Sequence, residues 1–125
     1  MKILGLGVDL ADIGRVEHVL DKYPRFAERC FTEHEREYAF RYAKPSRRLA
    51  ARFAGKEAVM KSLGRGFRQI GWQEIEITGG GRPTVRMFGR ALDRASHLGV
   101  SEVLVTITHT DTSALVMAVA VGEHD

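Results

Sequence analysis

The sequence predicts an α+β fold: a compact single domain over residues 1–125 with a mostly antiparallel sheet and a long central helix. Apolar residues recur at helical spacing through most of the first half, whereas the second half holds the alternating or continuous apolar runs typical of strands. A chain of 125 residues can bury roughly two-thirds of its unfolded surface as one domain. No apolar run approaches the roughly 20 residues of a membrane-spanning helix, so we expect no membrane association. The predicted order of elements is βααααββαββ.

One short strand and two helices are predicted to begin the chain. Residues 3–8 form the strand, which ends at Asp9, and Asp12 then caps a helix with one apolar side. Pro24 suits the first turn of another short helix, which reaches Cys30. The single cysteine excludes an intramolecular disulfide, and its aromatic neighbours indicate a buried small side chain without a catalytic role.

Two further helices follow, and the second is the longest in the chain. Thr32 and Glu35 match a capping box, which opens a helix through about Ala43. A Lys-Pro step then breaks the helical pattern. Ser46 can cap the long helix over residues 47–63, and the two glycines of LGRG suit its C-terminal end.

The second half is predicted to hold four strands and one helix. Residues 72–78 alternate in polarity and form a hairpin with residues 84–88, joined through the GGGRP turn. A short helix over residues 89–98 is stopped by the glycine that follows it. Residues 103–108 and 113–121 are strongly apolar strands connected by HTDT.

Basic residues are concentrated in the first part of the chain. The net charge is +3, and residues 1–70 hold 15 Lys and Arg against 9 Asp and Glu, whereas residues 71–125 hold 4 against 7. This asymmetry indicates an anionic partner or a phosphate-rich ligand, although solvated helix faces explain it equally well. The N-terminal stretch MKILGLGVDLAD lacks the features of a secretory signal, so we expect a cytoplasmic protein.

Three charged side chains are candidates for chemistry. Asp9 comes just after the first strand, where a carboxylate can bind a hard cation, but on local grounds a helix-capping role is favoured. Glu57 precedes Lys61 by four residues, so an acid and a base lie on one face of the long helix. A surface ion pair is the alternative, although Ala50 and Ala54 on that face would let another surface come close.

His109 is a further candidate, because it directly follows an apolar strand. Side chains at strand ends often line pockets, and the flanking Thr108 and Thr110 add hydroxyl donors suited to phosphate. A hydrogen-bonded turn residue is the alternative reading of this histidine, and it is the favoured one on local grounds.

Five segments together resemble the signature blocks of the holo-[acyl-carrier-protein] synthases. They are GVDLADIGRVE, FTEHEREY, FAGKEAVMKSLGRG, GGGRPTV and TITHT, in the family's order and over nearly the whole chain. The resemblance implies a cytoplasmic 4′-phosphopantetheinyl transferase of fatty acid (lipid) biosynthesis. Such an enzyme moves the phosphopantetheine arm of coenzyme A to a serine of apo-acyl carrier protein with the aid of magnesium, and 3′,5′-ADP leaves. It also implies a homotrimer whose active sites lie between neighbouring subunits.

The resemblance assigns roles to individual residues. Asp9 and Glu57 are implied as magnesium ligands, with Lys61 stabilising the leaving phosphate. The base that takes the serine proton stays open, with Glu57 preferred, acting through a metal-bound water. The implied coenzyme A contacts are Lys61, Gly64, Arg65, Gly66, Arg82, Pro83, Thr108, His109 and Thr110. The implied docking residues for the carrier are Arg15, His18, Lys22 and Arg25.

Three positions depart from the family pattern without removing a reactive group. Thr108 stands where serine is common, Arg65 where threonine is common, and Gly55 where alanine is common. Gly55 should weaken the helix by about 0.5 to 1 kcal/mol unless it permits a closer approach. The main alternative function is a non-catalytic basic module that binds RNA, but the chain lacks an aromatic stacking platform, so we expect no nucleic-acid partner.

Overall fold

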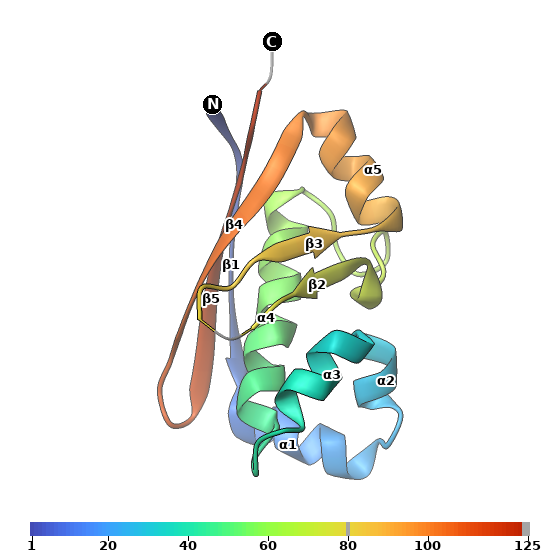
Figure 1. Cartoon of the computed structure of the whole chain (residues 1–125), viewed down its shortest axis with the longest axis vertical. Coiled ribbons are helices and arrows are strands. Elements are labelled where there is room, and N and C mark those ends of the chain that lie inside the picture. Colours follow the sequence, from blue (N-terminus) through green and yellow to red (C-terminus); the bar gives the residue numbers. More distant parts are fainter. Residues whose placement is uncertain (80, 124–125) are drawn as a thin grey trace.

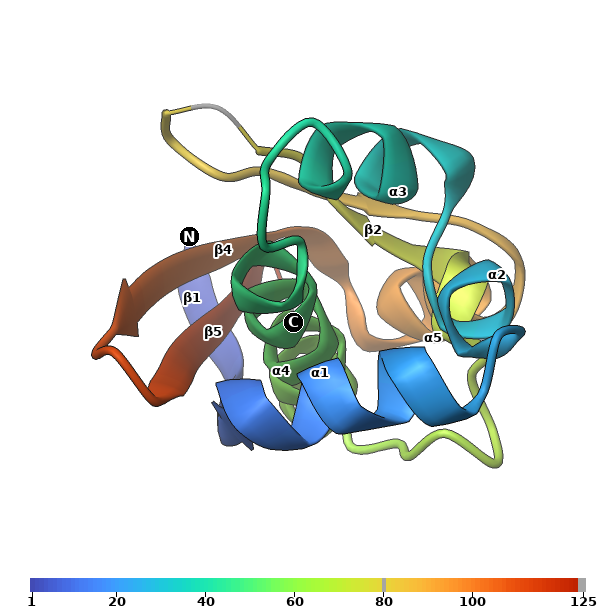
Figure 2. The ribbon, with the colours of Figure 1, turned by 90° about the horizontal axis from the view of Figure 1, so that it is seen from below.

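Helix α4 (Ser46–Ser62) forms the centre of the computed structural model, which describes residues 1–79 and 81–123 (Figure 1). Most of its surface is buried, because a three-stranded sheet covers one side while shorter helices and a hairpin pack on the others. Seen nearly end-on in Figure 2, α4 lies between the sheet, helix α1 and helix α3. The α+β class, the antiparallel pairing and the long central helix are confirmed.

The sheet consists of β1 (Lys2–Asp12), β5 (Ser113–Gly122) and β4 (Val100–His109), in that spatial order. Both neighbouring pairs are antiparallel. Along the central strand β5, exposed Leu115 and Met117 alternate with buried residues, as expected for a sheet with one covered face. The buried ones are Ala114, Val116, Ala118 and Ala120. Because most of these are alanine, α4 can pack close to the sheet.

The short helices are α1 (Ile13–Lys22), α2 (Phe26–Cys30) and α3 (Glu33–Ala39). Their predicted caps are confirmed: Asp12 Oδ1 accepts a hydrogen bond of 2.8 Å from the Arg15 amide, and both halves of the capping box between Thr32 and Glu35 are present. Cys30 is half-buried, and burial raises the pKa of its thiol against the opposing charges of Lys56 and Arg29. The reactive thiolate is therefore disfavoured.

Four predicted boundaries in the first half are wrong. Helix α2 begins at Phe26 with Arg25 at its cap position, so Pro24 precedes the helix and is not in its first turn. Strand β1 runs on from residue 8 to Asp12, because it pairs with β5 along this whole stretch, so Asp9 lies within a strand and does not cap a helix. Helix α3 ends at Ala39 rather than Ala43, since the chain must turn before Pro45. Ser46 is the first residue of α4 and is buried, and the cap position is taken by Pro45, whose side chain accepts no hydrogen bond.

The second half is confirmed in its order but not in all its bounds. Trp72–Glu74 form a 3₁₀ helix, η1, and only Ile75–Ile77 form strand β2, which pairs with β3 (Val85–Met87). The Glu74 carboxylate accepts a hydrogen bond from the Gly71 amide, and this local bond competes with strand pairing. Strand β4 begins three residues earlier than expected and includes His109.

Helix α5 (Gly89–Leu98) ends at Gly99, whose left-handed φ of 81° confirms the predicted stop. The predicted GGGRP turn between β2 and β3 contains Gly80, which lies outside the described residues. Among the helices of residues 1–79 and 81–123, none has the length and apolar character needed to cross a membrane.

Candidate active site

Two glycines bring strand β1 unusually close to helix α4. A Cβ atom built on Gly7 would lie 1.9 Å from the Ala58 carbonyl oxygen, and one on Gly5 would lie 1.8 Å from the Ser62 carbonyl oxygen. Any side chain at these positions would force the strand away from the helix. Asp9 follows on the same face of β1, because side chains two residues apart point the same way. The close packing therefore delivers Asp9 to α4.

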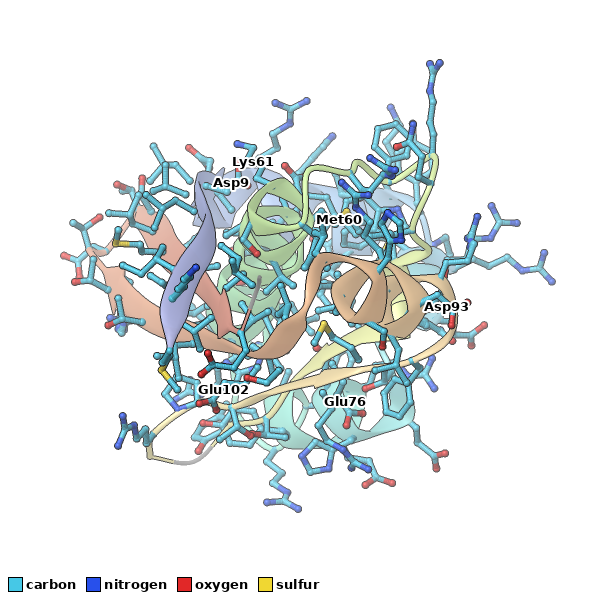
Figure 3. All side chains as sticks on the ribbon, turned by 90° about the horizontal axis from the view of Figure 1, so that it is seen from above. Asp9, Met60, Lys61, Glu76, Asp93 and Glu102 are labelled. Carbon is cyan, nitrogen blue, oxygen red and sulfur yellow. The ribbon has the colours of Figure 1, made fainter. Side chains whose placement is uncertain are left out.

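Asp9, Glu57 and Lys61 meet at this junction. Lys61 Nζ lies 3.1 Å from Asp9 Oδ1 and donates a 3.0 Å hydrogen bond to the Val8 carbonyl oxygen (Figure 3). The Asp9 side chain is 16% exposed and the Lys61 side chain 54%. Within the described residues the ion pair of Lys61 is thus with Asp9, and not with Glu57 as the helical spacing suggested.

Glu57 interacts with Asp9 through charge and through a hydrogen bond between their side chains. Burial, the negative charge of Asp9 and a hydrogen bond to its side chain raise the pKa of the Glu57 carboxyl to about 7, against the opposing charge of Lys61. Two carboxyl groups this close favour sharing a proton or a cation over both standing as free anions. The pair therefore has the electrostatic character of a cation site.

The donor set fits a hard divalent cation whose shell is completed by other oxygens. In the described part of the chain, no third His, Cys, Asp or Glu joins the two carboxylates. Magnesium is usually held in this way, by one or two carboxylates together with waters and substrate phosphates. Asp9 and Glu57 suit such an ion.

A cavity of about 580 Å³ opens beside the two carboxylates. Arg15 of α1 lines it together with Asp9 and Glu57, so the structure brings a predicted docking residue to the predicted metal ligands. The apolar part of the lining includes Val16, Val19, Phe26 and Phe53. We call this cavity the carboxylate cavity. The other predicted docking residues, His18, Lys22 and Arg25, are exposed.

His109 lines a different cavity, of about 400 Å³, which also includes the predicted contact Pro83. The other charged residues of its lining are Arg47, Arg48 and Arg52, and we call it the arginine cavity. Because β5 separates β1 from β4, the two cavities open at different edges of the sheet. Within one chain, His109 is therefore not brought together with Asp9 and Glu57.

The arginines were missed by the sequence analysis. Arg52 is only 5% exposed, and its Nε, among the described groups, has no hydrogen-bond partner. Burial lowers the pKa of its guanidinium, and Tyr38 lies 4.6 Å from it, ring centroid to Cζ. A buried guanidinium with a spare donor is suited to an anion. The available signal was the spacing of Arg48 and Arg52, one helical turn apart on α4.

The remaining predicted contacts are dispersed. Thr110 Oγ1 accepts hydrogen bonds from the Thr112 and Ser113 amides, so it is Thr110 that acts as the hydrogen-bonded turn residue. Thr108 pairs with Leu115 on the exposed face of the sheet. Gly64, Arg65 and Gly66 follow the end of α4 and line neither cavity, and Arg82 is exposed in the hairpin loop.

Comparisons with known proteins show the family of the chain. A model of the 4′-phosphopantetheinyl transferase superfamily matches residues 5–120. The chain is 39% identical to a holo-[acyl-carrier-protein] synthase of Natranaerobius thermophilus, with 94% of this chain and 96% of that protein covered. It is similar in structure to a Plasmodium yoelii acyl carrier protein synthase with ADP bound (TM-score 0.88, 27% identity, 98% of both chains). It is also similar to a Bacillus anthracis holo-(acyl-carrier-protein) synthase in complex with CoA (3′,5′-ADP) (TM-score 0.77, 29% identity, 94% of this chain and 96% of that one).

Proposed function

The chain belongs to the 4′-phosphopantetheinyl transferase superfamily, and from this premise we propose that it transfers 4′-phosphopantetheine from coenzyme A to a serine of apo-acyl carrier protein. The observation that carries the proposal is that Asp9 and Glu57 line one cavity together and that Lys61 Nζ lies 3.1 Å from Asp9 Oδ1. A basic module that binds RNA would explain the charge asymmetry but not this cluster. We expect the protein to act in the cytoplasm.

We propose that Asp9 and Glu57 hold magnesium, which supplies charge neutralisation at the coenzyme A pyrophosphate. The serine hydroxyl of the carrier attacks the β-phosphorus, and the bond to the oxygen of 3′,5′-ADP breaks. Glu57 is the proposed acceptor of the serine proton, through a bridging water, because its carboxylate lines the carboxylate cavity beside Asp9. Lys61 is exposed enough to turn its ammonium toward the departing phosphate and stabilise its charge.

The arginine cavity is proposed to bind a phosphate group of coenzyme A. Arg47, Arg48 and Arg52 supply fixed positive charge there, and His109 adds a further donor. The spare Nε of the buried Arg52 supports an anionic occupant, since a bound phosphate oxygen would satisfy it.

We propose that the active site forms between copies in a homotrimer. Support comes from the face of the sheet turned away from α4, where apolar side chains of neighbouring strands form one exposed patch. Its members are Leu6, Val8, Leu10, Leu104, Leu115 and Met117, all at least 39% exposed. A heterologous contact through this patch would allow the arginine cavity of one copy to complete the carboxylate cavity of the next. Light scattering should then give three times the mass of one chain.

The deciding experiment is incubation with apo-acyl carrier protein, coenzyme A and magnesium, followed by intact-mass measurement of the carrier. The carrier should gain the mass of one phosphopantetheine, and chelation of magnesium should prevent the gain. Asp9→Asn and Glu57→Gln should each abolish most transfer while keeping the fold by circular dichroism. A carrier of unchanged mass with the wild-type protein would refute the proposed function.

Docking of the carrier is proposed to use Arg15, which lines the carboxylate cavity from α1. Acyl carrier proteins are acidic, so a basic rim should steer their approach and make the association rate fall with salt. Arg15→Glu should raise KM for the carrier and leave the affinity for coenzyme A nearly intact. An unchanged carrier KM at low ionic strength would contradict this role.

A further inference from the structure

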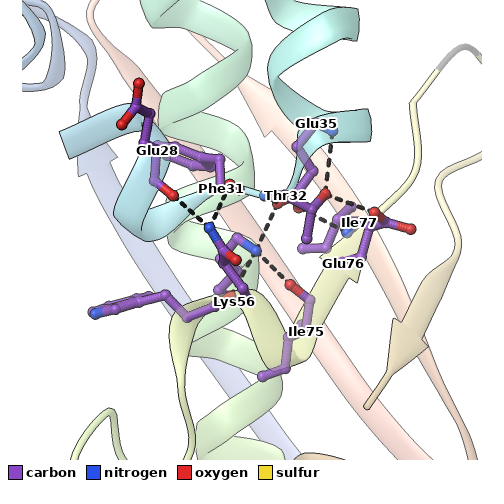
Figure 4. Close-up of polar contacts among 10 residues, drawn as sticks. Glu28, Phe31, Thr32, Glu35, Lys56, Ile75, Glu76 and Ile77 are labelled. Carbon is purple, nitrogen blue, oxygen red and sulfur yellow. Dashed lines mark hydrogen bonds and ion pairs between the residues drawn. The ribbon is translucent and has the colours of Figure 1, made fainter. Parts of the chain in front are cut away.

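A fully buried ion pair lies between the short helices and α4. Lys56 Nζ is 2.7 Å from Glu35 Oε1, and neither side chain is exposed to solvent (Figure 4). Burial lowers the pKa of Lys56, and the charge of Glu35 opposes this effect. Removing two charges from water is unfavourable, and an apolar pair of the same size is often as stable. The pair therefore calls for an explanation other than stability.

The hydrogen bonds of the pair supply that explanation. The β2–β3 hairpin has only three paired positions, and β3 covers one edge of β2. At the other edge, Lys56 Nζ donates to the Ile75 carbonyl oxygen, and Glu35 Oε2 accepts a 2.8 Å hydrogen bond from the Ile77 amide. Lys56 also donates at 2.8 Å to the Trp72 carbonyl oxygen, so its three donors are all used. The two side chains take the place of a missing neighbouring strand.

The segments joined in this way form part of the wall of the arginine cavity. Tyr38, one helical turn after Glu35 on α3, lines that cavity, and so does Gly79, two residues after Ile77. Arg52, one turn before Lys56 on α4, lines the same cavity. Both Tyr38 and Arg52 approach Gly79, because a Cβ built there would lie 2.6 Å from the Tyr38 ring and 2.2 Å from an Arg52 nitrogen. A small displacement of the hairpin would therefore alter the cavity.

We propose that Glu35 and Lys56 are positioning residues for phosphate binding: by fixing the free edge of β2, they hold α3 and the hairpin loop around Arg52. This inference rests on the proposed function, in which the arginine cavity binds a phosphate group of coenzyme A. It predicts that disrupting the pair weakens binding of the nucleotide part of the substrate more than it slows the chemical step.

The test uses Glu35→Gln and Lys56→Met in the full chain. Calorimetric titration with 3′,5′-ADP, without magnesium so that the carboxylate pair is not engaged, should give a Kd raised about tenfold by either variant. KM for coenzyme A should rise in parallel, while kcat at saturating coenzyme A stays within about twofold of wild type. Glu35→Gln keeps the size of the side chain but leaves the buried Lys56 ammonium without its counter-charge, so it disrupts the pair and decides the matter where Lys56→Met does not fold.

Val100→Ala is the matched control, because Val100 is buried at the far end of β4 from His109. It should lower the melting temperature without changing the Kd for 3′,5′-ADP. If Glu35 and Lys56 have a purely structural role, their variants should behave like Val100→Ala, with a lower melting temperature but an unchanged Kd and KM. That result would overturn the inference.

Amide hydrogen exchange separates this inference from the proposed function. Loss of the pair should speed exchange at the Ile77 amide ahead of global unfolding. Wild-type protein that does not bind 3′,5′-ADP would refute phosphate binding by the arginine cavity. Wild-type protection of Ile77 in both variants would refute the positioning role by itself.

Discussion

Substitution of Gly7 by alanine should separate the two carboxylates of the active site. The added Cβ would lie 1.9 Å from the Ala58 carbonyl oxygen, whereas real Cβ contacts are essentially never shorter than 3.0 Å, so β1 must retreat from α4 by about 1 Å or more. Overpacking of this kind typically destabilises a fold by about 1 to 3 kcal/mol. Asp9 would move with the strand. Misplacement of a reacting group by about 1 Å can cost about 100-fold in rate, or about 2.7 kcal/mol of barrier.

Intact-mass kinetics over a range of magnesium concentrations should show both a lower kcat and a higher magnesium requirement for Gly7→Ala. Gly5→Ala is the matched control, because its Cβ would meet the Ser62 carbonyl oxygen at 1.8 Å but lies four residues from Asp9. We expect a similar loss of stability on urea unfolding with a smaller loss of activity. If Gly7→Ala keeps the wild-type kcat and magnesium requirement, the glycines do not set the geometry of the carboxylates.

Three further predictions test electrostatics, packing and assembly. Without metal, the pKa of Glu57 in the folded protein is raised to about 7, so the folded state binds this proton more tightly than the unfolded state. The protonated Glu57 therefore contributes fully to the free energy of unfolding below about pH 4.5, and this contribution is lost as the pH rises through 7. After allowance for solvent screening, urea unfolding in a chelator should show a decline of no more than about 1 to 2 kcal/mol, absent in Glu57→Gln. A Cβ on Gly55 would lie 2.2 Å from Ile77 Cδ1, an atom that valine lacks. Gly55→Ala should therefore raise the free energy of unfolding by up to about 1 kcal/mol in an Ile77→Val background but not in the wild-type background. If the effects of the two substitutions simply add in a double-mutant cycle, this contact does not explain Gly55. Equal amounts of the Glu57→Gln and His109→Ala proteins, refolded together, should recover about a quarter of the wild-type activity, because that fraction of shared sites receives an intact Glu57 from one copy and an intact His109 from its neighbour. If mixed trimers form and no activity returns, the sites are not shared.

The order of the elements was predictable because it depends on local periodicity. The runs in β4 and β5 and the apolar pattern of α4 are visible in the sequence. The predicted ends of helices and strands were wrong where a side-chain hydrogen bond or pairing with a distant segment determines the backbone conformation. Glu74 accepts from the Gly71 amide and turns WQE into a 3₁₀ helix, and β5 keeps β1 extended through Asp9. Neither interaction can be predicted from the hydrophobic periodicity of the sequence or from the secondary-structure propensities of its residues.

The site was predictable in its residue types but not in its contacts. Asp9, Glu57 and Lys61 were found through their motifs, yet the partner of Lys61 depends on how closely β1 packs on α4. Lys56 gave no signal, because a lysine beside a glutamate on a helix usually faces solvent. The spacing of Thr32 and Glu35 predicted the capping box, but not that the same carboxylate is buried against Lys56.

The placement of charge on α4 supports the proposal that a single chain supplies only part of the active site at each cavity. Arg48, Arg52 and Lys56 recur every four residues and face α3 and the hairpin, while Glu57 and Lys61 form a second row toward β1. Positions 52 and 57 differ by five residues, or about 140° around a helix, so one ligand cannot easily contact both rows. Coenzyme A carries charge at both its pyrophosphate and its ribose phosphate. Both groups could be neutralised at one cleft if one copy supplies the arginine row and its neighbour supplies the row of Glu57 and Lys61. The exposed apolar face of the sheet supports such an association of copies.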